Sequence, residues 1–153
     1  RLIINLEKLY LSLKKLELKD SPVDEYYQLS HKLGIPQRNM NKLQNKLFGI
    51  ECNFEELNGI DFKKGCYVGQ ENTARIKLKN KLSKRLLPVE IIEGELNQDD
   101  LIYNGEFEVG KVLINNEYPF ALIKYLDDHF IKGIEFKCKN AKLKIKKPDW
   151  IKE

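Results

Sequence analysis

The chain has 153 residues, enough for one domain of ordinary size or two small ones, and 42% of them are hydrophobic, which is typical of a globular protein with a packed core. Its 27 Lys and Arg residues against 23 Asp and Glu residues give a net charge of +4, too small to require nucleic acid as a partner. No apolar run approaches the roughly 20 residues of a membrane helix, and the first residues lack the layout of a signal peptide. We therefore expect a monomeric globular protein without membrane association or direct nucleic-acid binding.

The cysteine pattern predicts a reducing environment. Cys52, Cys66 and Cys138 are odd in number and widely spaced, and they include no CxxC pair. This pattern predicts neither a disulfide framework nor a complete metal site, so we expect a cytoplasmic protein. Because the chain does not begin with methionine, we also expect it to be part of a longer protein.

The first fifty residues contain both ambiguous and clear signals. Residues 2–6 are apolar enough for a strand, and residues 9–18 alternate leucine with Lys and Glu in a way that fits either two strands or a helix. We favour strands. Ser21 as N-cap and Pro22 at the first helical position then predict a helix over residues 22–33 that ends at Gly34.

Two short segments follow this helix. Met40, Leu43 and Leu47 predict a short helix stopped by Gly49. The segment Asn53–Glu56 has the pattern of a capping box and predicts a single helical turn that ends at Gly59.

After residue 70 the pattern changes from helix to strand. Residues 70–77 predict a helix, whereas residues 86–92, 107–114 and 120–126 each predict a strand and residues 134–146 predict a final strand pair around Asn140. Polar turn residues separate these segments. Several short strands with polar turns predict a small antiparallel barrel, with a domain boundary between residues 81 and 84.

Lysines alternate with apolar residues near the end of the chain. They occupy positions 137, 139, 142, 144, 146 and 147. This alternation is typical of a half-exposed edge strand. A nucleic-acid surface would need stacking aromatic residues among the lysines, and only Phe136 and Trp150 are near.

The segment Lys63–Glu71, with the sequence KKGCYVGQE, has the most specialised composition in the chain. Lysines beside a thiol favour the thiolate, which is the nucleophile and the metal ligand, so Cys66 is the candidate reactive residue. Gly65 and Gly69 allow unusual backbone conformations or let another group come close to the backbone. Gln70 and Glu71 fit the first turn of a helix, whose N-terminus further favours an ionised thiol.

The string KGCYVGQE resembles the signature of the YgfZ family of folate-binding proteins, which are tied to iron–sulfur cluster maintenance and are related to the aminomethyltransferase of the glycine cleavage system. Further similarity lies in Asn58–Phe62 before the motif, in Ala74–Arg75 and Lys84–Pro88 after it, and in Gly110–Val112 and Lys147–Trp150. The resemblance covers nearly the whole chain but only the later part of the family, whose members begin well before the equivalent of Arg1.

The resemblance implies an α+β fold in which residues 1–83 are the last part of an aminomethyltransferase-like domain and residues 84–153 form a small antiparallel β-barrel. It implies a tetrahydrofolate-type cofactor, most of whose cavity lies in the family's earlier part. It further implies that Cys66 is the working thiol and that Lys64 keeps it ionised or meets an anionic ligand. The implied cofactor-binding residues are Lys64, Gly65, Tyr67, Gly69, Gln70, Glu71 and Arg75.

Each of these residues also has an ordinary structural interpretation. Cys66 could be a buried packing thiol, and Lys64 a solvated surface lysine. Gln70 and Glu71 could only cap their helix, and Arg75 could pair with Glu71 four residues earlier. The other cysteines, with His31 and His129, are interpreted as structural, because neither histidine has a companion at metal-ligand spacing.

Three functions remain open. The first, implied by the resemblance, is an accessory factor that binds folate and supports iron–sulfur cluster assembly or repair in client proteins, including enzymes that modify tRNA. The second is folate-dependent aminomethyl transfer, against which Cys66 argues because that relative lacks the cysteine. The third is a lysine-rich barrel that binds RNA or a protein. We expect an accessory factor rather than a classical enzyme, with a barrel more stable than residues 1–81.

Overall fold

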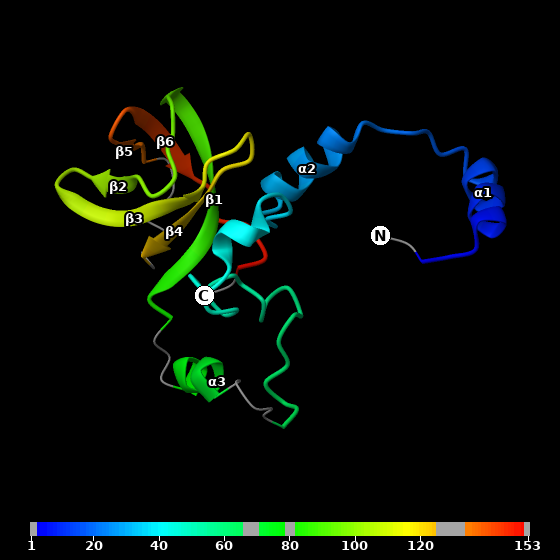
Figure 1. Ribbon diagram of the computed structural model, residues 1–153, viewed down its shortest axis with the longest axis horizontal. Helices are drawn as coiled ribbons and strands as arrows, with labels where there is room; N and C mark the ends of the chain where they lie inside the picture. The colour runs from blue at the N-terminus through cyan, green and yellow to red at the C-terminus, as the bar shows by residue number, and fades with distance from the viewer. Residues whose placement is uncertain (1–2, 66–70, 79–81, 125–133, 152–153) are drawn as a thin grey trace.

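The computed structural model describes residues 3–65, 71–78, 82–124 and 134–151, which form four helical segments and a six-stranded barrel (Figure 1). The helical segments are α1 (Leu6–Lys15), α2 (Val23–Lys32), the 3-10 helix η1 (Met40–Leu43) and α3 (Glu71–Leu78). The strands are β1 (Lys84–Gly94), β2 (Leu101–Asn104), β3 (Phe107–Ile114), β4 (Phe120–Lys124), β5 (Phe136–Cys138) and β6 (Ala141–Ile145). No helix in these ranges is long and apolar enough to cross a membrane.

The predicted antiparallel barrel is confirmed. Its strands close in the order β1-β4-β3-β2-β5-β6, and every pairing is antiparallel. Strand β1 makes the closure possible because it is long: residues 84–88 pair with β4, and residues 89–94 continue along β6. The interior contains fully buried side chains from different strands, among them Val89, Ile102, Phe136 and Leu143.

Gly94 lies where the seam between β1 and β6 ends. Its φ is +83°, and a Cβ atom there would lie 1.9 Å from the carbonyl oxygen of Asn140. Only glycine takes this conformation at no cost while allowing so close an approach. Gly94 thus allows the closure of the barrel at this seam.

The predicted edge strand at the lysine run is wrong. Strand β6 pairs with β5 on one side and with β1 on the other, so it has no free edge. The alternation itself is confirmed, because Ala141, Leu143 and Ile145 point into the barrel between outward lysines. A strand inside a closed barrel and an edge strand of an open sheet share this period-two pattern.

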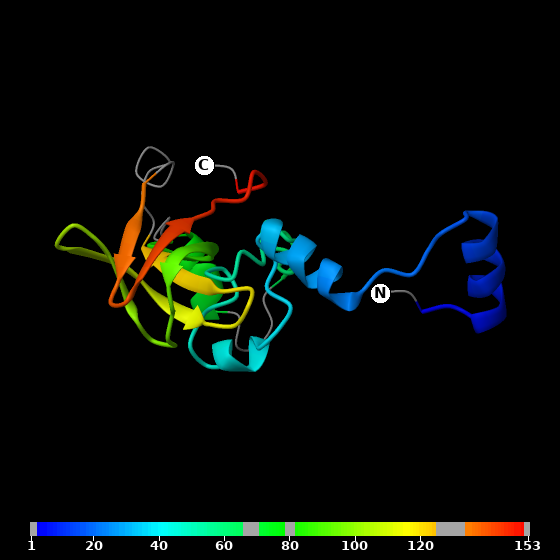
Figure 2. The ribbon, with the colours of Figure 1, turned by 90° about the horizontal axis from the view of Figure 1, so that it is seen from above.

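The predicted strands within residues 2–18 are also wrong, because residues 6–15 form α1. The Asn5 side chain caps this helix, with its Oδ1 accepting hydrogen bonds from the backbone N–H of Glu7 at 3.0 Å and of Lys8 at 3.3 Å. A helix satisfies its own backbone groups, whereas a strand needs a neighbour. Helix α1 has no buried residue, and both ribbon views place it away from the barrel (Figures 1 and 2).

Helix α2 confirms the helix predicted at 22–33, with a different start. Pro22 is the N-cap and Val23 the first helical residue, while the Ser21 hydroxyl donates to the Glu25 carboxylate instead of capping the helix. Gly34 ends the helix with φ +74°, and a Cβ atom there would lie 2.2 Å from Pro148 Cγ. The end of α2 is therefore packed against the C-terminal segment.

Residues 40–53 join the helical part of the chain to the barrel. Leu43 and Cys52 pack in one cluster with residues of β1, β3 and β4: Leu86, Leu113, Ile114 and Phe120. The predicted helix at 40–47 is present only as the four residues of η1. The boundary proposed at residues 81–84 stays a prediction, as does the aminomethyltransferase-like origin of the first part.

Candidate functional site

The structure describes half of the sequence-predicted site residues. Lys64, Gly65, Glu71 and Arg75 are described and exposed. Cys66, Tyr67, Gly69 and Gln70 lie outside the described residues. Two described segments border the motif, residues 51–65 before it and α3 after it.

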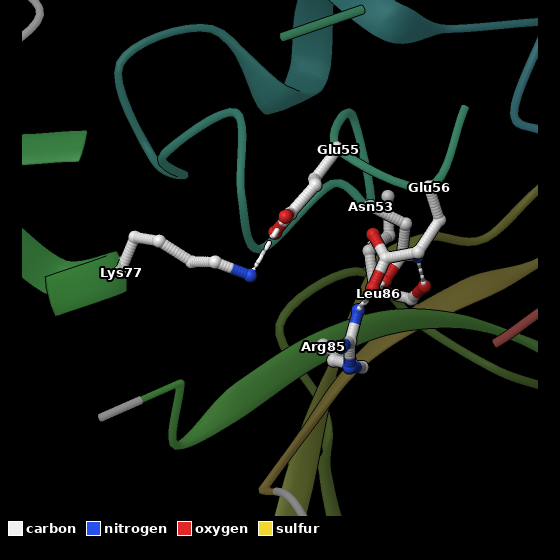
Figure 3. A network of polar contacts seen from close by, with 6 residues as sticks. All are labelled: Asn53, Glu55, Glu56, Lys77, Arg85 and Leu86. Carbon is white, nitrogen blue, oxygen red and sulfur yellow. Dashed lines mark hydrogen bonds and ion pairs between the residues drawn. The ribbon is translucent and has the colours of Figure 1, made fainter. Parts of the chain in front are cut away.

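Helix α3 is tied to the segment that precedes the motif. Lys77 Nζ lies 2.7 Å from Glu55 Oε1 and 2.8 Å from Glu55 Oε2 (Figure 3). The same ammonium group lies 5.7 Å from the centroid of the Phe62 ring, within the range of a cation–π contact. One lysine in α3 thus contacts two residues on the other side of the motif.

Arg85, at the start of β1, anchors the same segment to the barrel. Its Nη1 lies 2.7 Å from Glu56 Oε1 and donates to Asn53 Oδ1 at 2.8 Å (Figure 3). The Arg85 and Glu56 side chains are only 12% and 19% exposed. A partly buried charge-assisted hydrogen bond is stronger than a solvated one, and removing one partner leaves the other charge poorly compensated.

Asn53 occupies the centre of this network. It is 2% exposed, and its Nδ2 donates to the Leu86 carbonyl at 2.8 Å. A parallel backbone bond joins the Leu86 N–H to the Glu51 carbonyl at 2.8 Å. The Asn53 backbone has φ +61°, a left-handed conformation that asparagine tolerates better than most residues. Asn53 therefore fixes residues 51–56 on β1.

These contacts correct the predicted capping box. The Asn53 side chain bonds to β1 instead of capping its own turn. The predicted single turn is present, because the Leu57 N–H donates to the Asn53 carbonyl at 3.0 Å and the Gly59 N–H donates to the Phe54 carbonyl at 2.6 Å. Sequence analysis also missed Lys77, Glu56 and Arg85 as members of the site. Their ion-pair and hydrogen-bond partners lie more than 20 positions away, so no local spacing could have identified them.

Arg75 and Lys77 are both cations of α3, but they differ in their contacts. Glu71 and Arg75, which both lie in α3, do not form the ion pair considered as one alternative for Arg75 within the described part of the chain. Lys77, rather than Arg75, is the α3 cation that contacts the opposite segment. The helix predicted at residues 70–77 is confirmed as Glu71–Leu78, with Gln70 outside the described residues.

Cys52 and Cys138 are packing residues, as predicted. They are 7% and 1% exposed. Burial raises the pKa of each thiol to about 11, with smaller contributions from Glu51 to Cys52 and from Asp100 to Cys138. Both thiols are therefore protonated near pH 7 and have little nucleophilic or metal-binding character. In the ranges that the structure describes, no group of three His, Cys, Asp or Glu residues could hold a metal ion.

A cavity of about 440 Å³ lies beside the motif, lined by Glu55, Asn58, Ile60, Asp61, Phe62 and Lys63. None of the cofactor-binding residues implied by the family resemblance is among these lining residues. Lys64, Gly65, Glu71 and Arg75 are exposed. Their role in binding a cofactor stays a prediction.

Similar proteins are found by comparison with curated sequences. Over 77 residues, 50% of this chain, it is 42% identical to "Iron-sulfur cluster assembly factor IBA57 homolog, mitochondrial" of Dictyostelium discoideum, of which the match covers 18%. It is 41% identical over 68 residues to the Neurospora crassa protein of the same name and 36% identical over 74 residues to the mouse factor, covering 44% and 48% of this chain and 16% and 20% of those proteins. No protein-family profile matches the chain.

These relatives overturn the predicted cytoplasmic location, because their names describe mitochondrial proteins. The prediction rested on free cysteines, which indicate a reducing compartment but do not identify it. The expected link to iron–sulfur cluster assembly is supported by the same names. The homologues of this chain, over about half its length, are thus named mitochondrial iron–sulfur cluster assembly factors.

Proposed function

We propose that this chain is part of a mitochondrial iron–sulfur cluster assembly factor of the YgfZ family, with Cys66 as its working thiol. The observation that carries the proposal is the similarity to the named assembly factors, together with the KGCYVGQE motif. Because the matches cover at most 20% of the three relatives compared above, the activity of the whole protein is part of the proposal.

The other two cysteines support the assignment to Cys66 by their burial. A thiol with a pKa of about 11 offers less than a thousandth of its population as thiolate at pH 7. A single accessible thiolate can hold or pass on sulfur, iron or a one-carbon group, although it cannot enclose a cluster alone. Cys66, preceded by two lysines, is the candidate for that chemistry.

The contacts on either side of the motif tie its two bordering segments to each other and to the barrel. Lys77 joins α3 to Glu55 and Phe62, and Arg85 joins the turn at Asn53 and Glu56 to the barrel. Residues 53–62 therefore hold both α3 and the start of β1. A site whose supporting segments are already fixed binds at a lower entropic cost, which supports the proposed role of the motif.

Folate binding and client specificity are the finer parts of the proposal. Tetrahydrofolate or a derivative is the cofactor that the family resemblance implies, and residues beyond the described ones would have to supply most of its cavity. The partners would be iron–sulfur client proteins, among them enzymes that modify tRNA. The protein would act as an accessory factor rather than as an aminomethyltransferase.

The lysine-rich barrel is a weaker candidate for RNA binding because four of its lysines are paired with carboxylates. Lys142 Nζ lies 2.7 Å from Glu93 Oε2, and Lys146 Nζ lies 2.8 Å from Glu90 Oε2. Lys111 and Lys124 pair with Asp99 and Glu108 in the same way. A surface on which these cations face carboxylates of neighbouring strands attracts phosphate less than a purely basic one.

The test is to replace Cys66 by Ser in the full-length protein and to measure the activity of iron–sulfur enzymes in cells that depend on it. A hydroxyl is not ionised near pH 7 and is a poor ligand for soft metals, so client activity should be lost while the protein still accumulates. Cys138→Ala removes a buried thiol and should leave client activity intact. Client activity sustained by Cys66→Ser would overturn the proposed role of the thiol.

Alkylation of the 153-residue chain gives a second measurement. At pH 7 a thiolate-selective reagent should label Cys66 at least about a hundred times faster than Cys52 or Cys138, since each pKa unit changes the thiolate fraction about tenfold. Labelling of the two buried thiols should rise as the pH approaches 11. Equal labelling rates for all three at pH 7 would contradict the assignment.

A further inference from the structure

His31 lies at the contact between α2 and the barrel and is the next-to-last residue of the helix. Its Nε2 is 3.0 Å from the carbonyl oxygen of Pro119, just before β4. The same carbonyl accepts the Val89 N–H of β1 at 3.1 Å. The half-buried ring meets Phe120 edge-on, with centroids 5.2 Å apart and planes at 89°, and its centroid is 5.8 Å from that of Tyr118. His31 thus fixes the helix to the turn between β3 and β4.

Three further contacts hold the helix, two at its C-terminal end and one near its start. Trp150 Nε1 donates to the Leu33 carbonyl at 2.7 Å, and Pro148 packs against Gly34. The Tyr118 hydroxyl donates to the Asp24 carbonyl at 3.3 Å. Between α2 and the barrel lies an open groove of about 1260 Å³, with walls that include Tyr26, Leu29, Pro88 and Trp150. Few contacts therefore hold the helix, and its residues Val23, Tyr26 and Leu29, which line the groove, remain exposed.

From this geometry we propose that α2 is a pH-sensitive latch, which is held on the barrel while the His31 ring is neutral and loosens when the ring takes up a proton. The hydrogen bond to Pro119 does not itself oppose protonation, because an imidazolium can still donate to that carbonyl. The opposing factor is burial, since the charge would lie against Phe120, Tyr118 and the barrel wall. A charged ring therefore favours a loosened helix that returns it to water.

The charged groups around His31 compensate this burial only in part. Glu90 of β1 attracts the proton, but its carboxylate is already bonded to Lys146 at 2.8 Å. Lys146 and Lys147 line the groove beside His31, and Arg38, paired with Glu117 at 3.1 Å, lies on the other side. Burial outweighs the favourable contributions of Pro119, Val89 and Glu90, so the pKa of His31 is lowered below 6.5.

The lowered pKa of His31 makes the docking of α2 weaker at low pH. A lowered pKa means that docked His31 binds a proton more weakly than the same ring in water. The neutral His31 ring therefore gives its full stabilisation of the docked helix above pH 6.5. This stabilisation is lost as the pH falls through the lower pKa of the docked state. Tyr118 does not titrate in this range, because a hydrogen bond to Asp24, burial and nearby carboxylates raise its pKa to about 12.

The test uses Trp150, which is the one tryptophan of the chain and contacts the end of α2 directly. The fluorescence of the 153-residue chain would be followed from pH 8 to pH 5, with far-UV circular dichroism in parallel. We expect the emission to shift to longer wavelength in one transition with a midpoint below 6.5, while the dichroism stays constant. An emission spectrum that does not change with pH would overturn the latch, and so would a parallel loss of dichroism.

Two substitutions show which histidine causes the fluorescence transition. His31→Gln keeps a donor for Pro119 but cannot be protonated, so its emission should not change with pH. His129→Gln removes the other histidine and should keep the transition of the unmodified chain. A transition that persists in His31→Gln would overturn the assignment. If His31→Gln does not fold, NMR titration of the His31 ring in the unmodified chain decides, since a pKa at or above 6.5 contradicts the proposal.

Discussion

The barrel and α1 use similar apolar residues with opposite results. Phe136, Ile102 and Leu143 are completely buried inside the barrel, whereas Leu6 of α1 is 82% exposed and Tyr10 and Leu11 are each 66% exposed. Each barrel strand is hydrogen-bonded to two neighbours, so the barrel encloses its own core. Helix α1 satisfies its backbone internally and buries none of its side chains. Apolar periodicity therefore predicts which face an element would bury but not whether anything covers that face.

The largest expected change in unfolding free energy distinguishes the barrel from α1. Phe136→Ala should lower the free energy of unfolding by about 3–5 kcal/mol, because it leaves a cavity in a closed core. Leu6→Ala, at an exposed position, should change it by less than about 0.5 kcal/mol. Urea unfolding followed by circular dichroism measures both. Equal losses would mean that α1 is packed in solution.

A smaller effect tests the closure of the barrel at the seam between β1 and β6. Gly94→Ala places a Cβ atom against the Asn140 carbonyl at φ +83° and should cost about 2–3 kcal/mol in unfolding free energy. Gly105→Ala is the matched control, because its φ is +60° and nothing lies within 4 Å of the added atom. It should cost about 1 kcal/mol, from backbone conformation alone. Thermal unfolding of the two variants should rank them in this order, and the reverse ranking would contradict the seam described here.

The connection between the two regions should also show in the unfolding free energy. Asn53→Ala removes the hydrogen bonds to the Leu86 carbonyl and to Arg85, and should cost about 1–3 kcal/mol. Asn58→Ala shares the left-handed backbone, with φ 58° against 61°, but is exposed. The difference between the variants in chemical denaturation isolates the hydrogen bonds from the backbone strain. No difference would mean that Asn53 does not stabilise the connection.

The smallest effect is expected at Lys77. Lys77→Met removes a pair whose side chains are 45% and 32% exposed, and such pairs contribute less than about 1 kcal/mol. Lys124→Met, which removes a comparably exposed pair with Glu108, is the control on the barrel surface. A double-mutant cycle with Glu55→Gln measures the coupling. A coupling well above 1 kcal/mol would show that α3 is held more strongly than this exposure allows.

The sequence predicted the elements that repeat a local pattern. The strand at 107–114 matches β3, and the strand pair around Asn140 matches β5 and β6. The pattern at residues 9–18 was compatible with both a helix and strands, and a strand interpretation requires a partner strand that the chain does not provide there. The capping box at Asn53 failed for a related reason, since a side chain that can cap its own turn can also bond to a distant carbonyl.

Of the candidate site, the sequence by itself determined the motif, its lysines and the helix that follows, because these depend on neighbouring residues. The closure of β6 onto β1 and the contacts of Lys77 and Arg85 were decided only by the tertiary structure. The strand pairing and the ion pairs among these contacts join residues more than 20 positions apart. Periodicity describes which way a side chain faces along its own element, while the partner across a gap in sequence is chosen by how the elements pack together.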